Sequence, residues 1–320
     1  MIGWLKRHLL ALGITLGATL LLAGGALYYF TGILASFTVT IPVSARPNLT
    51  PAYLGLFYEE ISTVSVDGYH LKAWSIPAPA KAPPLPSVIV IHGLGMNKEF
   101  MLGYVALAHA AGHPVLAIDL RGHGDSDPSL TTLGEREPLD IEAWINLLEQ
   151  EGQAQKKPLL KPILWGTSLG AVTALRTAAA DPRVGGVIAD APFDTLRHTM
   201  AVHAKLFFNL PEYPLVPLTA WQVSRKLRFN IDDVNSFQAV RAIHVPILIL
   251  AAEKDRRMAL PSVRSIFDAA NEPKQFYLIP GEDHERRPFS PAFRDRITHF
   301  LDTCDAWNGI GQETAVMPTP

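Results

Sequence analysis

Short runs of apolar residues alternate along most of the chain with longer segments in which apolar residues recur every three or four positions. Runs made almost wholly of Val, Ile, Leu and Ala are typical of strands buried on both faces of a parallel sheet. Such runs occupy 87–91, 115–118, 187–189 and 246–252, and a further strand is expected at 275–279. Helical spacing is found in 98–111, 138–150, 260–271 and 291–301. Strands that alternate with helices predict an α/β fold, with a mostly parallel sheet and helices on both of its faces.

Two departures from this alternation shape the domain. Segments 57–66 and 71–76 alternate apolar and polar residues around Asp67-Gly68, a hairpin turn signal. Between 191 and 242 the alternation stops, and prolines and aromatic residues accumulate. Because this insertion follows the carboxyl end of a strand, we expect a small helical cap over the site at that sheet edge. Its aromatic residues either pack the cap itself or line an acyl pocket.

The N-terminus has a different pattern, because no charged residue occurs between Leu9 and Phe30. A helix of this length spans a bilayer, and Tyr28 to Phe30 suit its interface. The basic residues Lys6 and Arg7 come first, which predicts a cytoplasmic N-terminus and a catalytic domain on the extracytoplasmic side. A cleaved signal peptide is the alternative, but the apolar run exceeds the roughly 7–15 residues of such a core.

The sequence therefore divides into a transmembrane anchor at 1–35, an extended tether at 36–56, an α/β domain at 57–302 and a flexible tail at 303–320. The 320 residues are 48% hydrophobic with a net charge of −2, which suits one large domain and argues against nucleic acid as a partner. The single cysteine, Cys304, has no internal disulfide partner. The oligomeric state is unknown from the sequence.

The chemistry centres on Gly166-x-Ser168-x-Gly170, which stands between a short apolar strand and an alanine-rich helix. This order predicts a nucleophile elbow, a sharp turn that exposes the serine hydroxyl at a helix N-terminus. The glycines suit the turn because backbones pack closely around it. The motif alone is weak, and its value depends on a base elsewhere in the chain.

A serine nucleophile needs an adjacent base, which is itself oriented by a third group. Asp255 and His284 each follow a predicted strand, so both should lie at the same sheet edge as Ser168. The chain order of serine, acid and histidine is the one associated with the nucleophile elbow. Asp194 and Glu253 are rival candidates for the acid.

Taken together, the motifs resemble the α/β-hydrolase superfamily over about 57–301. The chain is most similar to small-capped serine hydrolases of the serine aminopeptidase and monoacylglycerol-lipase type, many of which carry an N-terminal membrane anchor. The matching pieces, besides the elbow, are Asp67-Gly68-x-x-Leu71-x-x-Trp74, His92-Gly93, Asp119-x-Arg121-Gly122-x-Gly124-x-Ser126, Asp190-Ala191-Pro192-Phe193, Asp255 and His284. One departure is the pair Glu282-Asp283, because the family usually has Gly-x-Gly or Gly-Ala-Gly before the histidine.

The resemblance implies an α/β-hydrolase fold in which Ser168 is the nucleophile, His284 the base and Asp255 the residue that orients it. The oxyanion hole should be formed by two backbone N–H groups, that of Leu169 and, by the resemblance, that of Leu94. Other polar residues at the sheet edge are expected to brace loops rather than act on substrate: His92, Asp119, Arg121 and His123.

The sequence thus predicts a membrane-anchored serine hydrolase that cleaves a carboxylic ester through an acyl-enzyme, with a small-molecule or lipid-like acyl substrate. A serine peptidase or amidase of the same fold is one alternative, and a non-catalytic binding protein of that fold is another. No cofactor is implied. No metal site is expected either, because the remaining histidines lack ligand spacing with one another or with Cys304.

Overall fold

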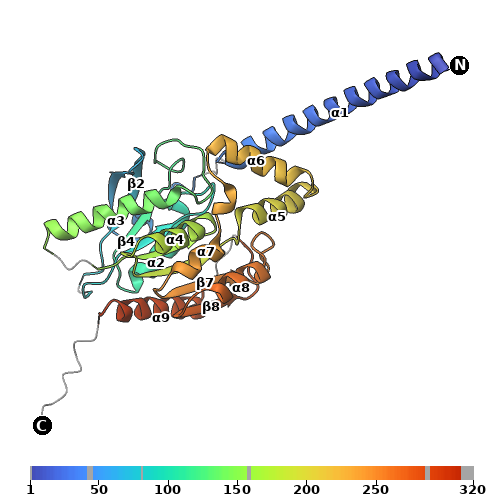
Figure 1. Cartoon of the computed structure of the whole chain (residues 1–320). Coiled ribbons are helices and arrows are strands. Elements are labelled where there is room, and N and C mark those ends of the chain that lie inside the picture. Colours follow the sequence, from blue (N-terminus) through green and yellow to red (C-terminus); the bar gives the residue numbers. More distant parts are fainter. Residues whose placement is uncertain (1, 42–45, 81, 157–159, 285–288, 311–320) are drawn as a thin grey trace, which may run out of the picture.

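The computed structural model of the chain describes residues 2–41, 46–80, 82–156, 160–284 and 289–310 (Figure 1). At its centre is an eight-stranded sheet in the order β1-β2-β4-β3-β5-β6-β7-β8. The strands are β1 Glu59–Val64, β2 His70–Ile76, β3 Val88–Ile91, β4 Val115–Ile118, β5 Ile163–Thr167, β6 Gly186–Asp190, β7 Ile247–Ala252 and β8 Lys274–Ile279. The predicted hairpin joins β1 and β2, β2 pairs antiparallel with β4, and all other pairs are parallel. The expected α/β fold is confirmed.

Helices cover both faces of the sheet. Successive side chains of each buried strand point to opposite faces, so each strand contributes apolar residues to two cores. Ile89 and Ile91 of β3 belong to a core shared with α3, α4, α7 and α8, whereas Val88 and Val90 belong to a second core shared with α2 and α9. These helices are α2 Leu102–Ala110, α3 Glu137–Ala154, α4 Leu169–Ala180, α7 Ser236–Ala242, α8 Leu260–Ala269 and α9 Pro291–Trp307. The short 3₁₀ helices are η1 Pro51–Leu54, η2 Lys98–Met101 and η3 Ile231–Asp233.

The N-terminal helix α1, Ile2–Val39, projects away from the domain (Figure 1). It is long and apolar enough to cross a membrane, with a mean hydropathy of 2.0. Its residues 3–26 are exposed, and its last part packs on α6 of the cap. The helix therefore continues past the position where we expected an extended tether to begin, because Ala35 and Val39 are buried in this contact. A signal sequence near the N-terminus can be equally long and apolar.

The cap lies between β6 and β7 and consists of α5 Leu196–Phe208, α6 Leu215–Leu227 and η3. The helix α7 falls within the expected cap segment of 191–242, yet it packs on α4 and belongs to the helix layer of the sheet. In α6, Gln222 Nε2 donates to the carbonyl oxygen of Tyr28 and the hydroxyl of Thr31, at 2.9 and 2.6 Å. The cap thus follows the carboxyl end of β6 and contacts the N-terminal helix through α6.

The aromatic residues of segment 191–242 divide into two groups by their burial. Phe193, Phe229 and Phe237 pack against the main core. In contrast, the outward-facing group of Phe207, Phe208, Tyr213 and Trp221 is 46–74% exposed. Two of these side chains meet aromatic residues of α1, in the pairs Phe208–Phe37 and Trp221–Tyr28.

At the C-terminus, α9 continues to Trp307, six residues beyond the predicted helix end at Leu301. The helix extends because Cys304 is fully buried in the core under β6, where its side chain lies against Gly186. The expected flexible tail of 303–320 therefore begins within an ordered helix. Residues 311–320 of that tail lie outside the described residues.

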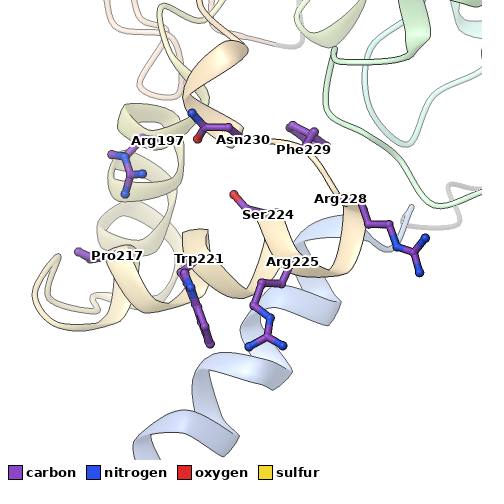
Figure 2. Close-up of a pocket in the computed structure, with 8 residues that line it drawn as sticks. All are labelled: Arg197, Pro217, Trp221, Ser224, Arg225, Arg228, Phe229 and Asn230. Atoms are coloured by element: carbon purple, nitrogen blue, oxygen red, sulfur yellow. The ribbon is translucent and has the colours of Figure 1, made fainter.

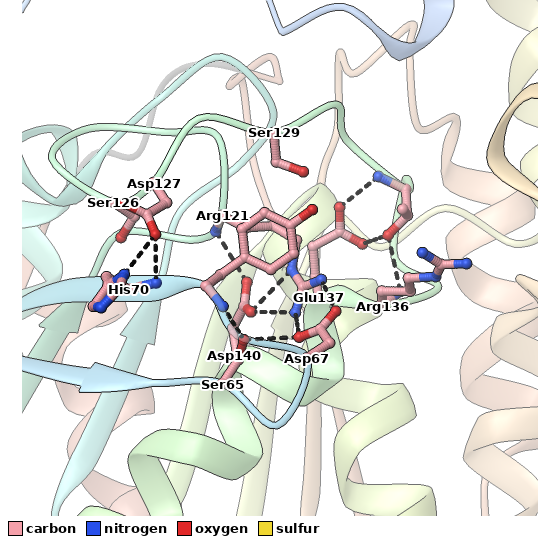
Figure 3. Close-up of polar contacts among 12 residues, drawn as sticks. Ser65, Asp67, His70, Arg121, Ser126, Asp127, Ser129, Arg136, Glu137 and Asp140 are labelled. Carbon is pink, nitrogen blue, oxygen red and sulfur yellow. Dashed lines mark hydrogen bonds and ion pairs between the residues drawn. The ribbon is translucent and has the colours of Figure 1, made fainter.

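A buried ion-pair network joins the β1–β2 hairpin to α3 through the loop that follows β4 (Figure 3). The guanidinium of Arg121, 1% exposed, donates to Asp67 of the hairpin and to Asp140 of α3, and the ring of Tyr69 lies 4.5 Å from its central carbon. The backbone N–H of Arg121 also donates to Asp140, at 2.9 Å. This network fits the bracing role expected for Arg121.

Replacing Arg121 with methionine should lower the free energy of unfolding by about 3–5 kcal/mol, because Asp140 would remain buried without its counter-ion. Urea titration followed by tryptophan fluorescence measures this change. The double variant Arg121→Met/Asp140→Leu should recover a large part of the loss, since no buried charge remains unpaired. Arg183→Met is the control: the Arg183 side chain, which pairs with Asp181 and Glu149, is 32% exposed, so a loss below about 1 kcal/mol is expected. Equal losses in both single variants would contradict the assignment.

Candidate active site

Ser168 lies at the turn between β5 and α4, in a backbone conformation that few residues other than glycine adopt. Its φ and ψ are 52° and −113°. The turn is tight enough that a Cβ at Gly166 would collide with the carbonyl of Gly170, and one at Gly170 would collide with the carbonyl of Ile91. The backbone N–H of Ser168 donates to the carbonyl of Asp190 at 2.8 Å, which fixes the turn to the end of β6. Strain held in place in this manner is common where a side chain must be presented for reaction.

The structure brings together the three residues that the sequence predicted as a set. His284 Nε2 lies 3.2 Å from Ser168 Oγ, and His284 Nδ1 lies 2.6 Å from Asp255 Oδ2. These residues follow β5, β7 and β8, so the parallel topology delivers all three to one edge of the sheet. The imidazole is therefore within hydrogen-bond reach of both a hydroxyl and a carboxylate.

Asp255 is held as a carboxylate although its side chain is fully buried. Burial acts to raise its pKa, but the hydrogen bond from His284 and those from the backbone N–H groups of Met258 and Arg257 outweigh it and bring the pKa below its ordinary value. Both backbone bonds reach Oδ1 at 2.8 Å, which leaves Oδ2 for His284. A carboxylate in this position favours the His284 tautomer with a proton on Nδ1 and a lone pair on Nε2, facing the serine.

The rival acids have other partners. Asp194 accepts from His198 Nδ1 at 2.7 Å and from the backbone N–H of Thr195 at 2.6 Å. Glu253 accepts from the backbone N–H of Gly281 at 2.7 Å and so supports the loop that carries His284. Of the three carboxylates considered, Asp255 is the one hydrogen-bonded to His284.

Two buried histidines brace the loop after β3, where the second oxyanion donor was predicted. His92 Nε2 accepts from the backbone N–H of Leu120 at 3.1 Å, and His123 Nε2 accepts from that of Gly95 at 3.2 Å. Their Nδ1 atoms face the carbonyls of Gly93 and Arg121. Burial, above all, lowers the pKa of both imidazoles, so both are neutral at pH 7. These contacts fit a bracing role for His92 and His123, as expected.

The predicted oxyanion donors Leu94 and Leu169 belong to the two segments that meet at Ser168. Leu169 is the first residue of α4, where backbone N–H groups lack partners within the helix. Leu94 follows Gly93, at which a Cβ would contact the Ser168 Cβ at 3.4 Å. Whether their N–H groups stabilise an oxyanion stays a prediction.

The sequence reasoning missed two residues near this edge. Lys98 was expected only as a helix start, yet it is 3% exposed and its Nζ donates to Asp119 and Asp125. Neither carboxylate is close to it in sequence, so no local signal identifies the cluster. His203 of α5 was passed over because it lacks ligand spacing, but its Nε2 is buried, and burial together with the charges of Arg257 and His284 lowers its pKa to about 4.

The cap also carries a surface pocket of about 440 Å³ (Figure 2). It lies between α5 and α6 and is lined by Arg197, Pro217, Trp221, Ser224, Arg225, Arg228, Phe229 and Asn230. None of Ser168, Asp255 and His284 lines it, so this pocket is not the place where an acyl group would meet the serine. Among the described residues, no group of three or more His, Cys, Asp and Glu side chains is arranged to hold a metal ion.

Comparison with known proteins bears on the whole α/β domain. A family described as "Alpha/beta hydrolase family" matches residues 88–296. Among curated proteins, the uncharacterized protein YqkD of Bacillus subtilis (strain 168) is 27% identical over 242 residues, which cover 74% of this chain and 77% of that protein. The quorum-quenching protein AidA of Acinetobacter baumannii is 31% identical over 168 residues, which cover 51% of this chain and 49% of that protein.

Two solved structures extend the comparison to the fold. The esterase Pf2001 of Pyrococcus furiosus has a TM-score of 0.67 at 24% identity and covers 82% of this chain and 97% of its own. A membrane phospholipase A has a TM-score of 0.58 at 18% identity and covers 93% of this chain and 99% of its own. At these identities the likeness shows a shared fold.

Proposed function

The chain belongs to the alpha/beta hydrolase family, and from that premise we propose that it is a membrane-anchored serine hydrolase that cleaves carboxylic esters through an acyl-enzyme. The observation that carries the proposal is the continuous hydrogen-bonded series from Ser168 through His284 to Asp255, with its serine at the strained turn after β5. A serine, a base within 3.2 Å and a carboxylate that orients the base are the parts that nucleophilic catalysis at a carbonyl requires.

In the proposed reaction, Ser168 Oγ attacks the ester carbonyl while its proton passes to His284 Nε2. Negative charge develops on the carbonyl oxygen, where the backbone N–H groups of Leu94 and Leu169 are the proposed donors, each worth roughly 3 kcal/mol. Collapse breaks the bond to the alcohol oxygen, which takes the proton from His284 as it leaves. Water then attacks the acyl-enzyme, with His284 as general base, and releases the acid and free Ser168.

The proposed membrane attachment rests on α1 and on the cap surface beside it. The exposed part of α1 has no partner within the described part of the chain, and a bilayer would cover this apolar surface. Where α1 meets the cap, Tyr28 and Trp221 lie 6.3 Å apart, and such residues favour the membrane interface. Exposed Phe207 and Phe208 continue the apolar surface. Attachment of this kind favours a lipid-like acyl substrate. In the proposed orientation, the N-terminus lies in the cytoplasm and the catalytic domain lies outside it.

The proposal is tested with the full chain in detergent micelles. A fluorophosphonate probe should label one residue, identified as Ser168 by peptide mass analysis, and p-nitrophenyl acetate, butyrate, octanoate and laurate should be hydrolysed at rates that show a chain-length optimum. Prior labelling should abolish the hydrolysis. A folded protein that is neither labelled nor active on any of these esters would contradict the esterase proposal. Labelling of Ser168 together with cleavage of amide but not ester substrates would reassign the protein as an amidase or peptidase.

A further inference from the structure

The contact between α1 and the cap lies where a bilayer surface is expected. An α-helix rises about 1.5 Å per residue, so the uncharged segment from Leu9 to Tyr28 is about 30 Å long, which matches the hydrocarbon thickness of a bilayer. At Tyr28 the cap meets α1: the centres of the Tyr28 and Trp221 rings are 6.3 Å apart, and Gln222 donates to the Tyr28 carbonyl. The neighbouring part of α6 therefore lies at the headgroup layer when α1 spans the membrane.

The C-terminal end of α6 carries three basic side chains, and none has a carboxylate partner within the described part of the chain. These residues, Arg225, Lys226 and Arg228, are all exposed. Lys226 Nζ donates to the Ser36 hydroxyl of α1 at 3.0 Å, and the Arg225 guanidinium lies 4.8 Å from the centre of the Trp221 ring. Figure 2 shows the Trp221 and Arg225 side chains extending from α6 on the side where α1 leaves the domain.

The surface pocket of about 440 Å³ beside these residues is cationic. Its lining includes Arg197, Arg225 and Arg228 but no Asp or Glu. Arg197 is paired with Asp232 through two hydrogen bonds, at 2.7 and 2.8 Å. The other two guanidinium groups have no ion pair among the described residues, so the pocket suits an anion.

Basic residues at a helix C-terminus also have a simpler role, because their charges interact favourably with the helix dipole. Arg225 and Lys226 lie in the last turn of α6, where this effect operates. The Arg225 guanidinium, however, lies over Trp221, one turn toward the N-terminus of the helix, and so extends away from the terminal carbonyls. Its position fits a ligand on the membrane side of the cap better than the helix end.

We propose that this part of the cap binds the phosphate of an anionic phospholipid in the leaflet next to the domain. Arg225 and Arg228 are the phosphate ligands, since a guanidinium can donate two parallel N–H bonds to phosphate oxygens, and Trp221 lies in the interface beside them. Because α6 belongs to the cap, the bound lipid holds the cap against the membrane surface. The inference rests on the proposed membrane attachment and is independent of the ester chemistry at Ser168.

The test measures lipid binding to the full chain in detergent micelles by native mass spectrometry. Dioleoyl phosphatidylglycerol and dioleoyl phosphatidylcholine have the same acyl chains, so the ratio of their dissociation constants reports the headgroup alone. Each basic residue near an anionic headgroup is worth about fivefold in affinity, so the wild type should prefer phosphatidylglycerol by about 30-fold. Arg225→Gln/Arg228→Gln should lower this preference to about fivefold or less, the share left to Lys226.

Two further variants show whether the preference belongs to this site. Arg225→Lys/Arg228→Lys should keep most of it, because the positive charges remain. Arg264→Gln/Arg294→Gln is the matched control, which removes two exposed arginines from α8 and α9, on the side of the domain away from α1 (Figure 1). Its preference should equal that of the wild type. Loss of thermal stability in Arg225→Gln/Arg228→Gln with the wild-type lipid ratio would overturn the proposal and leave only the helix-stabilising role.

A soluble competitor separates a lipid site from a general phosphate site. Glycerophosphoglycerol is the headgroup of phosphatidylglycerol without its acyl chains, and it should not displace the lipid at millimolar concentration. Displacement would make the pocket a site for a soluble phosphate ester and overturn the lipid assignment.

The membrane attachment itself is tested by alkaline carbonate extraction of phosphatidylcholine vesicles that contain the wild type. Retention in the vesicles without a preference for phosphatidylglycerol would overturn this inference and leave the anchor standing. Release from the vesicles would overturn the proposed attachment, on which the inference depends.

Discussion

Replacing Ser168 with alanine should reduce kcat for ester hydrolysis by about 10⁵–10⁶-fold, and His284→Ala should cost nearly the same. The two losses are expected to be equal because the residues act as a unit: without the base the hydroxyl stays protonated, and without the hydroxyl the base has nothing to activate. The double variant should therefore be no slower than either single variant. What remains above the uncatalysed rate would come from substrate binding and the oxyanion donors.

This non-additivity is measured with p-nitrophenyl butyrate at saturating concentration, with the wild-type active-site concentration determined by fluorophosphonate titration. Ser265→Ala is the matched control, because this hydroxyl of α8 donates only to the carbonyl of Ser262 in its own helix. It should stay within about twofold of wild type. Substantial turnover in Ser168→Ala would move the nucleophile elsewhere, and strictly multiplicative losses in the double variant would show that Ser168 and His284 act in separate steps.

The fold could be predicted from the sequence because its strongest local signals agree with the final packing. The apolar runs that became β3, β4 and β7 are buried on both faces, so a run of Val, Ile and Leu has one stable place, inside a parallel sheet. The site followed from the same regularity. Once strands alternate with helices, the residues just after the parallel strands meet at one edge of the sheet. Ser168, Asp255 and His284 could therefore be grouped from their positions after strands, without any distances.

Other features depend on contacts between segments distant in sequence. The helix α1 runs past Ser36 because Ala35 and Val39 find an apolar surface on α6, almost 200 residues away in the chain. Four cap aromatics face outward, although composition alone favoured packing or pocket lining. Tertiary packing buries Lys98 and the Nε2 atom of His203, whereas lysine and histidine side chains are mostly exposed in proteins.

Exchanging Asp255 for asparagine should lower kcat by about 10⁴-fold while leaving the fold intact. The amide keeps the size of the carboxylate and can still accept from the backbone N–H groups of Arg257 and Met258 through its oxygen. Its NH₂ group would then face His284 Nδ1 and favour the tautomer in which that nitrogen carries the lone pair. The proton would sit on Nε2, toward Ser168, and the imidazole could no longer take the serine proton.

The measurement is kcat for p-nitrophenyl butyrate, with thermal unfolding to confirm folding. Asp194→Asn is the matched control, since it is the same isosteric change at the same sheet edge, on a carboxylate that binds His198 and Thr195 rather than His284. Its loss should stay below about tenfold, the value of one neutral hydrogen bond at most. A reversed pattern, with Asp194→Asn the slower enzyme, would make Asp194 the orienting acid. Because both residues follow adjacent parallel strands, β6 and β7, that result would leave the fold unchanged and alter only which loop supplies the carboxylate.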